Sequence, residues 1–130
     1  MNKKKLVLGL LLAVVSCAMV QAQRPRVVYL GDARVDGGAD HDTIRVGAVD
    51  GTFRAIQLAV TGGSVRFDRV VVRYGNGSKE ELSIRRRIAD GARTRVIDLP
   101  GDRRVIQSVD LWYGKDNWRT RPRVQLFGVR

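Results

Sequence analysis

The chain has 130 residues, a formal net charge of +11 at pH 7 and one cysteine, Cys17. Because no cysteine follows Cys17, disulfide bridges, thiolate metal sites and cysteine nucleophiles are excluded from the rest of the chain. That remainder is long enough for a single domain with its own hydrophobic core.

The first 22 residues have the three regions of an export signal. Lysines at 3–5 are followed by an unbroken apolar run, 6–15, and the segment ends in Val20-Gln21-Ala22. The apolar run is too short to span a bilayer as a helix. We therefore expect a signal peptide over 1–22, cleavage before Gln23, and a mature protein in the periplasm or the medium with no transmembrane segment.

A lipoprotein is the alternative for the same segment. The run Val14-Val15-Ser16-Cys17 is compatible with a lipobox in which Cys17 would be lipidated and would anchor the protein to a membrane. A lipobox prefers leucine three residues before the cysteine, and this chain has Val14 there. The cleavage site before Gln23 also lies at the better distance from the apolar run, so we expect the soluble form.

The mature chain, 23–130, reads as strands nearly throughout. The expected strands span 26–31, 43–48, 52–60, 64–74, 79–88, 94–99, 104–113 and 121–129. Glycine, asparagine, aspartate or proline stands at nearly every junction. Asp50-Gly51 and Gly75-Asn76-Gly77 are typical hairpin turns, because tight turns need a positive φ. This pattern predicts an all-β fold, a single two-sheet antiparallel β-sandwich of about eight strands with a jelly-roll-like topology.

Alternation along the strands predicts which side chains form the core. The predicted core positions are Ile44, Val46, Ala48, Ile56, Leu58, Val60, Leu82, Ile84, Ile88, Val105, Val109, Leu111 and Tyr113. Near Asp68-Arg69 the apolar parity switches, from Val65 and Phe67 to Val70 and Val72. Such a switch indicates a β-bulge, or a central strand that is covered on both sides.

The stretch 36–42, Asp-Gly-Gly-Ala-Asp-His-Asp, holds three aspartates and the only histidine of the chain. Asp36, Asp40 and Asp42 are candidate calcium ligands, but their spacing lacks the alternating acidic positions and distal glutamate of an EF-hand. One histidine without a second one or a cysteine is too few for a typical zinc site. We expect no metal or cofactor, and interpret the stretch as a polar turn whose aspartates cap turns and pair with arginine. A calcium-dependent module is a distant alternative.

Catalytic residues are sparse. A hydrolase would have to combine His41 and Asp42 with a serine, and no serine lies in a G-x-S-x-G motif. The serines of the mature chain are Ser64, Ser78, Ser83 and Ser108. Glu80 and Glu81 are adjacent, so on a strand they face opposite ways and cannot form a paired acid and base. We therefore expect no enzyme, with a hydrolase as a distant alternative.

Arginine dominates the charge of the mature chain. Residues 23–130 hold 21 basic and 13 acidic residues, a net charge of +8, and 19 of the basic residues are arginine. A guanidinium group binds phosphate or carboxylate through two hydrogen bonds. In the envelope this favours an anionic glycan, a lipid or a protein as partner, and not nucleic acid. The alternative is that the arginines reflect composition alone and are solvated or paired with aspartate.

Several arginines recur two residues apart, at 85/87, 93/95 and 119/121/123. On a strand each set would line one face, with about 7 Å between neighbours. Trp112 has the opposite parity to the core positions of its strand, so an exposed tryptophan beside arginine could stack on a sugar ring. Alternatively, Trp112 only covers the outer sheet face or is packed by the loop 114–122. The predicted binding residues are Arg85, Arg87, Trp112, Trp118, Arg119 and Arg121.

Four segments carry a resemblance to known proteins: LGDARVDGGADHDTIRVG, FRAIQLAVTGGSVRFDRVVVRYGNG, TRVIDLPGDRRVIQSVDLWY and PRVQLFGVR. In them the chain resembles a family of small exported bacterial proteins of unknown function, over nearly all of 23–130. The resemblance implies an exported β-sandwich and supplies no activity. The closing RVQLFG is also similar to the last strand of discoidin-type, galactose-binding-like modules, which usually carry a terminal cysteine pair that this chain lacks. That likeness implies a jelly-roll topology and no particular ligand.

Two hypotheses of function follow. The first is an exported cell-envelope protein that acts as a non-catalytic binding module for an anionic glycan, a lipid headgroup or a protein partner. The second is a structural or stress-related envelope protein whose interface is with itself or with a partner. A concave surface that joins the tryptophans and arginines would favour the first hypothesis, and a flat apolar edge would favour the second.

Overall fold

The computed structural model describes residues 24–130. The expected signal peptide, the cleavage site before Gln23 and the alternative lipidation site at Cys17 lie outside the described residues. Within the described part of the chain, no helix is long and apolar enough to cross a membrane.

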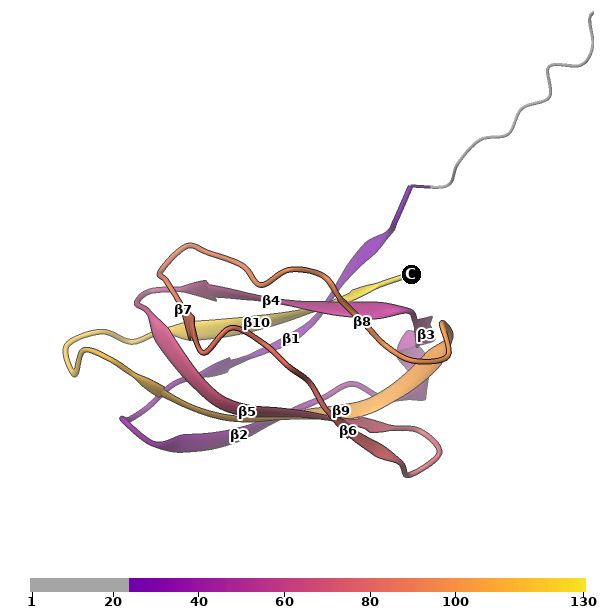
Figure 1. Ribbon diagram of the computed structural model, residues 1–130, viewed down its shortest axis with the longest axis horizontal. Coiled ribbons are helices and arrows are strands. Elements are labelled where there is room, and N and C mark those ends of the chain that lie inside the picture. The colour runs from indigo at the N-terminus through magenta and orange to yellow at the C-terminus, as the bar shows by residue number, and fades with distance from the viewer. Residues whose placement is uncertain (1–23) are drawn as a thin grey trace, which may run out of the picture.

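Two antiparallel sheets face each other and form a β-sandwich, as predicted (Figure 1). The smaller sheet has the strand order β1-β10-β4-β8, and the larger sheet has the order β2-β9-β5-β6, with β3 added to β9 and β7 added to β5. The strands are β1 (Val27–Arg34), β2 (Asp40–Arg45), β3 (Thr52–Phe53), β4 (Ala55–Thr61), β5 (Val65–Tyr74), β6 (Lys79–Glu81), β7 (Arg87–Ile88), β8 (Ile97–Asp98), β9 (Arg104–Lys115) and β10 (Arg123–Val129).

The pairing is that of a jelly roll, which is one long hairpin rolled into two sheets. Without the two-residue strands β3 and β7, the pairs are nested: β1 with β10, β2 with β9, β4 with β8, and β5 with β6. Along the chain, most strands are therefore followed by a strand of the opposite sheet. This arrangement confirms the predicted sandwich.

The nested pairing explains one right and one wrong turn prediction. Gly75-Asn76-Gly77 joins β5 to β6 as a hairpin, with the Tyr74 amide donating to the Ser78 carbonyl at 2.9 Å. Asp50-Gly51 does not join paired strands. Instead, a single 3-10 turn, Ala48–Asp50, carries the chain out of β2, and β4 then pairs with β10 in the other sheet. Glycine indicates a turn at both places, but only the turn between β5 and β6, the innermost pair of the nested strands, connects two strands that pair with each other.

The core lies between the sheets and largely follows the predicted alternation. Ile56, Leu58 and Val60 are completely buried, as are Leu111 and Tyr113. Two predicted core residues are wrong. Val105 is only partly buried and Ile106 replaces it, because β9 has an irregularity there: Ser108 pairs with Arg73, but Ile106 pairs with Tyr74. Ala48 is exposed because it begins the 3-10 turn.

The predicted bulge at Asp68 is present in β5. Phe67 pairs with Tyr113 and Arg69 pairs with Trp112, so Asp68 has no partner in the register. The extra residue lets both halves of β5 point apolar side chains into the core. It also turns Arg69 to the outer face of the larger sheet.

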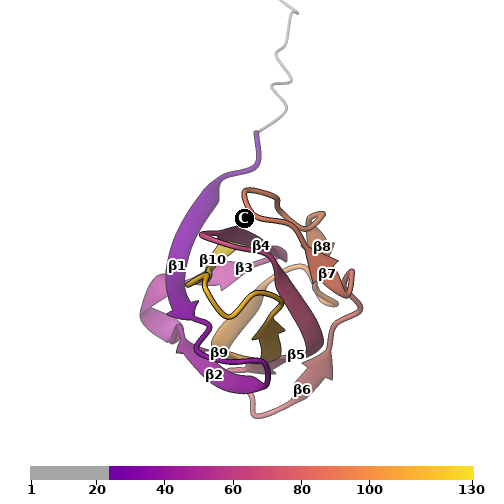
Figure 2. The same ribbon diagram turned by 90° about the vertical axis from the view of Figure 1, so that its left-hand side faces the viewer.

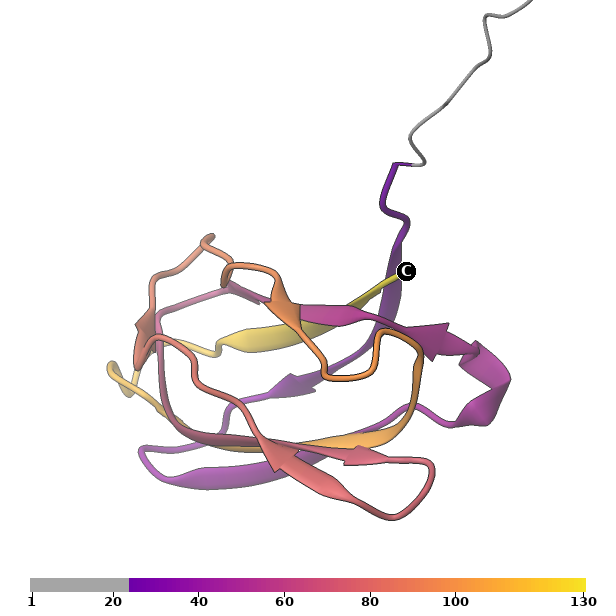
Figure 3. The same ribbon diagram turned by 45° about the vertical axis from the view of Figure 1, so that its right-hand side comes forward.

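The segment between β6 and β8 closes one side of the sandwich. β7 pairs with β5 in the larger sheet, and β8 pairs with β4 in the smaller one, so the chain crosses between the layers here. The expected strands 79–88 and 94–99 survive only as the short β6, β7 and β8. The β7 segment and the β9–β10 loop lie at the same end of the sandwich, away from the C-terminus (Figures 1 and 3).

Candidate functional site

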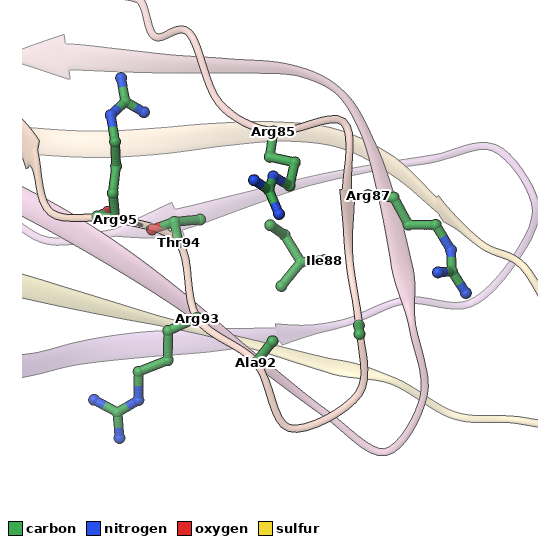
Figure 4. Close-up of a pocket in the computed structure, with 8 residues that line it drawn as sticks. Arg85, Arg87, Ile88, Ala92, Arg93, Thr94 and Arg95 are labelled. Atoms are coloured by element: carbon green, nitrogen blue, oxygen red, sulfur yellow. Dashed lines mark hydrogen bonds between the residues drawn. The ribbon is translucent and has the colours of Figure 1, made fainter.

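A hollow of about 550 Å³ opens where the crossing segment passes from one sheet to the other. It is lined by Arg85, Arg87, Ile88, Ala89, Ala92, Arg93, Thr94 and Arg95 (Figure 4). We call it the arginine hollow. Its four arginines are exposed, whereas Ile88 and Thr94 are buried and form the floor.

Hydrogen bonds to β4 hold the lower rim of the arginine hollow in place. The amide and hydroxyl of Thr94 bond to the carbonyl and amide of Leu58, at 2.8 and 3.0 Å. Gly91 donates its amide to the Val60 carbonyl at 2.8 Å, and the Asp90 carboxylate accepts from the Gly62 amide at 2.9 Å. The segment is therefore fixed without forming a regular strand, and its arginine side chains project from a rigid backbone.

The arginine hollow has an excess of positive charge. Arg87 Nε donates to Asp116 Oδ2 at 2.7 Å, and within residues 24–130 this is the one ion pair among the four guanidinium groups. Arg95 donates to the Ser83 carbonyl, and the Arg93 guanidinium lies 5.6 Å from the centre of the Phe127 ring. Arg85 bends over Ile88, while the other three extend outward in different directions (Figure 4). The four form a basic rim around the floor of Ile88 and Thr94.

Of the six predicted binding residues, the arginine hollow contains Arg85 and Arg87. They were expected on one strand face, but only Arg87 lies in a strand, β7. Arg93 and Arg95, which are not among the predicted binding residues, also line it. All four share the same two-residue spacing, but that they line one hollow depends on how the crossing segment folds.

The loop between β9 and β10 holds three more predicted residues, Trp118, Arg119 and Arg121. Trp118 is 78% exposed, and the Arg119 guanidinium lies 4.9 Å from the ring centre. Arg119 and Arg121 are exposed as well. The loop is connected to the arginine hollow through Asp116, which pairs with Arg87. Five of the six predicted residues therefore lie at one end of the sandwich.

Trp112, the sixth predicted residue, lies elsewhere. As its parity predicted, it leaves the core and faces outward from the larger sheet, where it is half-buried. The His41 ring stacks on it with centroids 4.3 Å apart and an interplanar angle of 7°, and the Arg69 guanidinium lies 4.9 Å from its centre. Because β2 and β5 flank β9, these groups cover opposite faces of the indole. Only the ring edge remains for a ligand, which leaves little room for stacking on a sugar.

A buried carboxylate, Asp110, lies beside this stack on the same outer face. It is 5% exposed, and it accepts hydrogen bonds from Thr43 Oγ1 at 2.5 Å and Arg73 Nε at 3.0 Å. Burial raises the pKa of Asp110, but the hydrogen bonds from Thr43 and Arg73 and the charges of Arg73 and His41 outweigh it, so the net pKa is lowered. An open depression of about 600 Å³ lies over these groups.

The aspartates of 36–42 serve the local structure. Asp40 accepts from the amides of Asp36, at 3.0 Å, and His41, at 2.8 Å, and so closes the turn. Asp42 accepts from the Tyr113 hydroxyl at 2.5 Å, and burial together with this bond raises the pKa of Tyr113. The expected arginine partners are not found for these three aspartates among residues 24–130, nor is a group of three or more side chains that could hold a metal ion.

The hypothetical hydrolase residues are not assembled. His41 points outward and Asp42 inward from β2, so they lie on opposite faces of the sheet. The carboxylate near His41 is Asp110, with Nε2 and Oδ1 3.9 Å apart. Ser108 pairs with Arg45, four positions along the ladder from His41 and thus roughly 13 Å away, with Asp110 in between. A serine triad needs the histidine between serine and carboxylate.

One comparison with known proteins gave a match. A family model described as "Domain of unknown function (DUF2541)" matches residues 6–128. The chain belongs to this family. The DUF2541 match confirms the resemblance to a family of unknown function, and it supplies no activity. Neither the curated proteins nor the solved structures gave a match.

The DUF2541 domain thus offers two polar surfaces of different character. On the outer face of the larger sheet, His41, Arg69, Arg73 and Asp110 are engaged with one another and with Trp112. At the end of the sandwich, the arginine hollow presents four guanidinium groups, of which Arg87 is paired with Asp116, and the Asp90 carboxylate on its rim is bonded to the Gly62 amide. On the second surface, three of the four guanidinium groups have no acidic partner within residues 24–130.

Proposed function

We propose that this DUF2541 protein is a non-catalytic binding module of the cell envelope, and that it takes a phosphate or carboxylate group of its ligand into the arginine hollow. The observation that carries the proposal is the arrangement of four arginines around one hollow, with a single ion pair among them. The export pattern of residues 1–22 supports the envelope location.

The chemistry of the arginine hollow suits an anionic group on a larger, partly apolar ligand. A guanidinium fork donates two parallel hydrogen bonds to a carboxylate or phosphate. The volume of about 550 Å³ is that of a small-molecule site, and Ile88, Ala89 and Ala92 contribute apolar side chains to its lining. An anionic sugar or a lipid headgroup combines the two properties.

A binding role is favoured over catalysis by what lines the arginine hollow. Its lining residues contain no histidine, serine, cysteine, aspartate or glutamate, so no nucleophile and base can be paired there. The hydroxyl of Thr94 is already bonded to the Leu58 amide and the Arg95 carbonyl. Guanidinium groups stay protonated and serve as donors, not as general bases.

Isothermal titration calorimetry with glucose 6-phosphate and with a uronic acid trisaccharide tests the proposal. We expect binding at about 50 mM salt that weakens markedly at about 300 mM, where the Debye length falls from roughly 14 to 6 Å. Arg85→Ser with Arg93→Ser should raise Kd about tenfold or more. Arg26→Ser with Arg103→Ser removes the same charge from exposed positions outside the hollow and should change Kd less than twofold.

Two results would count against the proposal. Equal effects of the two double variants would mean that net charge alone attracts the anion. Absence of binding at low salt would favour the structural protein instead, for which β1 provides an edge: it pairs only with β10, and Val27 and Tyr29 are 53% and 51% exposed. Sedimentation velocity would then show self-association that Val27→Lys abolishes.

A further inference from the structure

The loop between β9 and β10 presents a tryptophan on a backbone that is fixed by its own hydrogen bonds. Asn117 Oδ1 accepts from the Arg119 amide at 2.9 Å, and the Asn117 carbonyl accepts from the Thr120 amide at 3.1 Å and hydroxyl at 2.8 Å. From below, Lys115 Nζ donates to the carbonyls of Trp118, at 3.3 Å, and Thr120, at 2.9 Å. The backbone is ordered, yet the Trp118 side chain is 78% exposed. Apart from the Arg119 guanidinium, the ring is open to solvent.

The Trp118 loop and the arginine hollow lie side by side. Val65 of β5 pairs with Lys115 on one side and with Ile88 on the other, so the two segments are about two strand spacings, or roughly 10 Å, apart. The Arg87–Asp116 ion pair, at 2.7 Å, joins them directly. Figure 2 looks onto this end, with the β9–β10 loop in front and β7 beside it.

The surface combines an amphipathic aromatic ring with unpaired positive charge. Arg85, Arg119 and Arg121 are exposed and form no ion pair within the described residues, and the acid of the loop, Asp116, is paired with Arg87. Tryptophan is enriched at the membrane–water interface, where its ring lies among headgroups, and arginines nearby are attracted to anionic lipids. At this end of the domain, the tryptophan ring suits the interfacial layer of a bilayer and its basic neighbours suit anionic headgroups.

A lipid surface fits Trp118 better than a stacked sugar does. The Arg119 guanidinium already lies over the ring, 4.9 Å from its centre, and Trp118 does not line the arginine hollow. Stacking on a sugar uses a ring face, and Arg119 already lies over one of them, whereas insertion into an interface needs only a protruding ring. The C-terminus lies at the opposite end of the sandwich (Figure 3).

We infer that this end of the sandwich docks on an anionic lipid surface, with Trp118 in the interfacial layer and Arg119, Arg121 and the arginine hollow on the headgroups. The inference rests on the proposed function, because it takes a lipid headgroup as the anionic ligand of the hollow.

The test is cosedimentation of the protein with vesicles of phosphatidylcholine and phosphatidylglycerol, 3:1, followed by tryptophan fluorescence. We expect binding with a blue shift of the emission and quenching by brominated lipids, and at least tenfold weaker binding to vesicles of phosphatidylcholine alone. Trp118→Ala should weaken binding about tenfold or more and abolish the blue shift. Trp112→Phe should keep both, because the Trp112 ring is covered by His41 and Arg69.

Charge controls separate docking from general attraction. Arg119→Ser with Arg121→Ser should weaken vesicle binding several-fold, and Arg26→Ser with Arg103→Ser, which has the same net charge, should leave it within twofold. Thermal melts should show that Trp118→Ala is folded, since this side chain is exposed. Unchanged vesicle binding in Trp118→Ala, or no blue shift in the wild type, would overturn the inference.

Soluble ligands keep this result distinct from the proposed function. If Trp118→Ala loses vesicle binding but still binds glucose 6-phosphate through the arginine hollow, both conclusions are supported. If the wild type binds glucose 6-phosphate but not vesicles, docking alone is wrong. If vesicles bind through Trp118 but soluble anions do not, the proposed binding of anions in the hollow is wrong, and docking is reduced to Trp118 and the loop arginines. If the protein binds the trisaccharide through Trp118 but does not bind vesicles, the inferred lipid surface is wrong and the ligand of Trp118 is a glycan.

Discussion

At the scale of single residues, the most constrained charge of the molecule is Asp110. It lies on the outer face of a sheet and is nevertheless 5% exposed, because Thr43, Arg73, His41 and Trp112 surround it. Its hydrogen bonds keep the carboxylate ionised, and its pKa is lower than the ordinary value of 3.8. Parity alone would have placed it on a solvated face. The side chains that bury Asp110 come from the neighbouring strands, so its burial can be recognised only once the pairing of β2, β9 and β5 is known.

Asp110→Asn should therefore destabilise the fold by about 1–3 kcal/mol at pH 7, since it weakens a hydrogen bond between charged groups at a buried site. Because the folded-state pKa is depressed, the stabilisation is present above the ordinary pKa and is lost as pH falls through the folded-state pKa. Urea melts from pH 7 down to about pH 2 should thus show the difference between variant and wild type shrinking as the pH falls below the ordinary pKa of the carboxyl. Asp102→Asn, at an exposed positive-φ position that asparagine tolerates, is the control and should be nearly neutral. A pH-independent difference would contradict this role of the charge.

At the scale of elements, close packing between the 35–39 loop and β9 depends on Gly114. A Cβ at this position would lie 2.0 Å from the Gly38 carbonyl oxygen and 2.8 Å from the Arg66 guanidinium. Two hydrogen bonds hold the contact: Lys115 donates its amide to the Gly37 carbonyl at 2.9 Å, and Arg66 donates to the Gly38 carbonyl at 2.7 Å. The polar turn that Asp40 closes is thus fastened to the larger sheet.

Gly114→Ala should cost about 1–3 kcal/mol of unfolding free energy, because backbone atoms must move apart to admit the methyl group. Gly38→Ala is the matched control: a Cβ there meets no atom within 4 Å. Equilibrium denaturation of both variants measures the difference, and hydrogen exchange should show faster exchange of the Lys115 amide in Gly114→Ala. Equal stability of the two variants would show that the loop adjusts without cost.

The element scale also shows what sequence patterns can decide. Alternation found the core face of β4 and the bulge at Asp68, since both depend on side chains near in sequence. It did not find that 82–96 is mostly loop, because alternating residues there are anchored by Thr94 and Gly91 to β4, far away in sequence. Strand partners could not be predicted from turns either: Asp50-Gly51 and Gly75-Asn76-Gly77 look alike locally, and the rolled topology decides between them.

At the scale of the whole molecule, the sandwich followed from the number of short strands, but the candidate site did not. Arg85 and Arg95 are ten residues apart, and they share a hollow only because the chain crosses from one sheet to the other between them. Trp112 and Trp118 are close in sequence and yet lie on different surfaces, since β9 ends between them. Sequence spacing therefore identified residue types for anion binding, and the crossing segment determined which of them meet.

The net charge of +8 in residues 23–130 predicts how the whole molecule responds to salt. The folded protein has a radius of about 17 Å, so its charges lie closer together than those of the expanded unfolded chain. The resulting repulsion destabilises the folded state by roughly 4 kcal/mol at about 10 mM salt and by about 2 kcal/mol at about 200 mM. Five arginine–carboxylate pairs in residues 24–130 act in the opposite direction. The four more exposed pairs are each worth only about 0–1 kcal/mol. The pair of Arg73 with the buried Asp110 contributes more, and at such short range salt screens all five weakly.

Self-repulsion should therefore win, and the melting temperature should rise on the order of 5–10 °C between about 10 and 200 mM sodium chloride. Differential scanning calorimetry of the mature protein measures this rise. Arg26→Glu with Arg103→Glu lowers the net charge from +8 to +4 at exposed positions without ion pairs in the described chain. This variant should melt higher than the wild type at low salt and respond less to added salt. A wild-type melting temperature that falls with salt would mean that the local arginine–carboxylate pairs, and not the net charge, dominate the electrostatics of the fold.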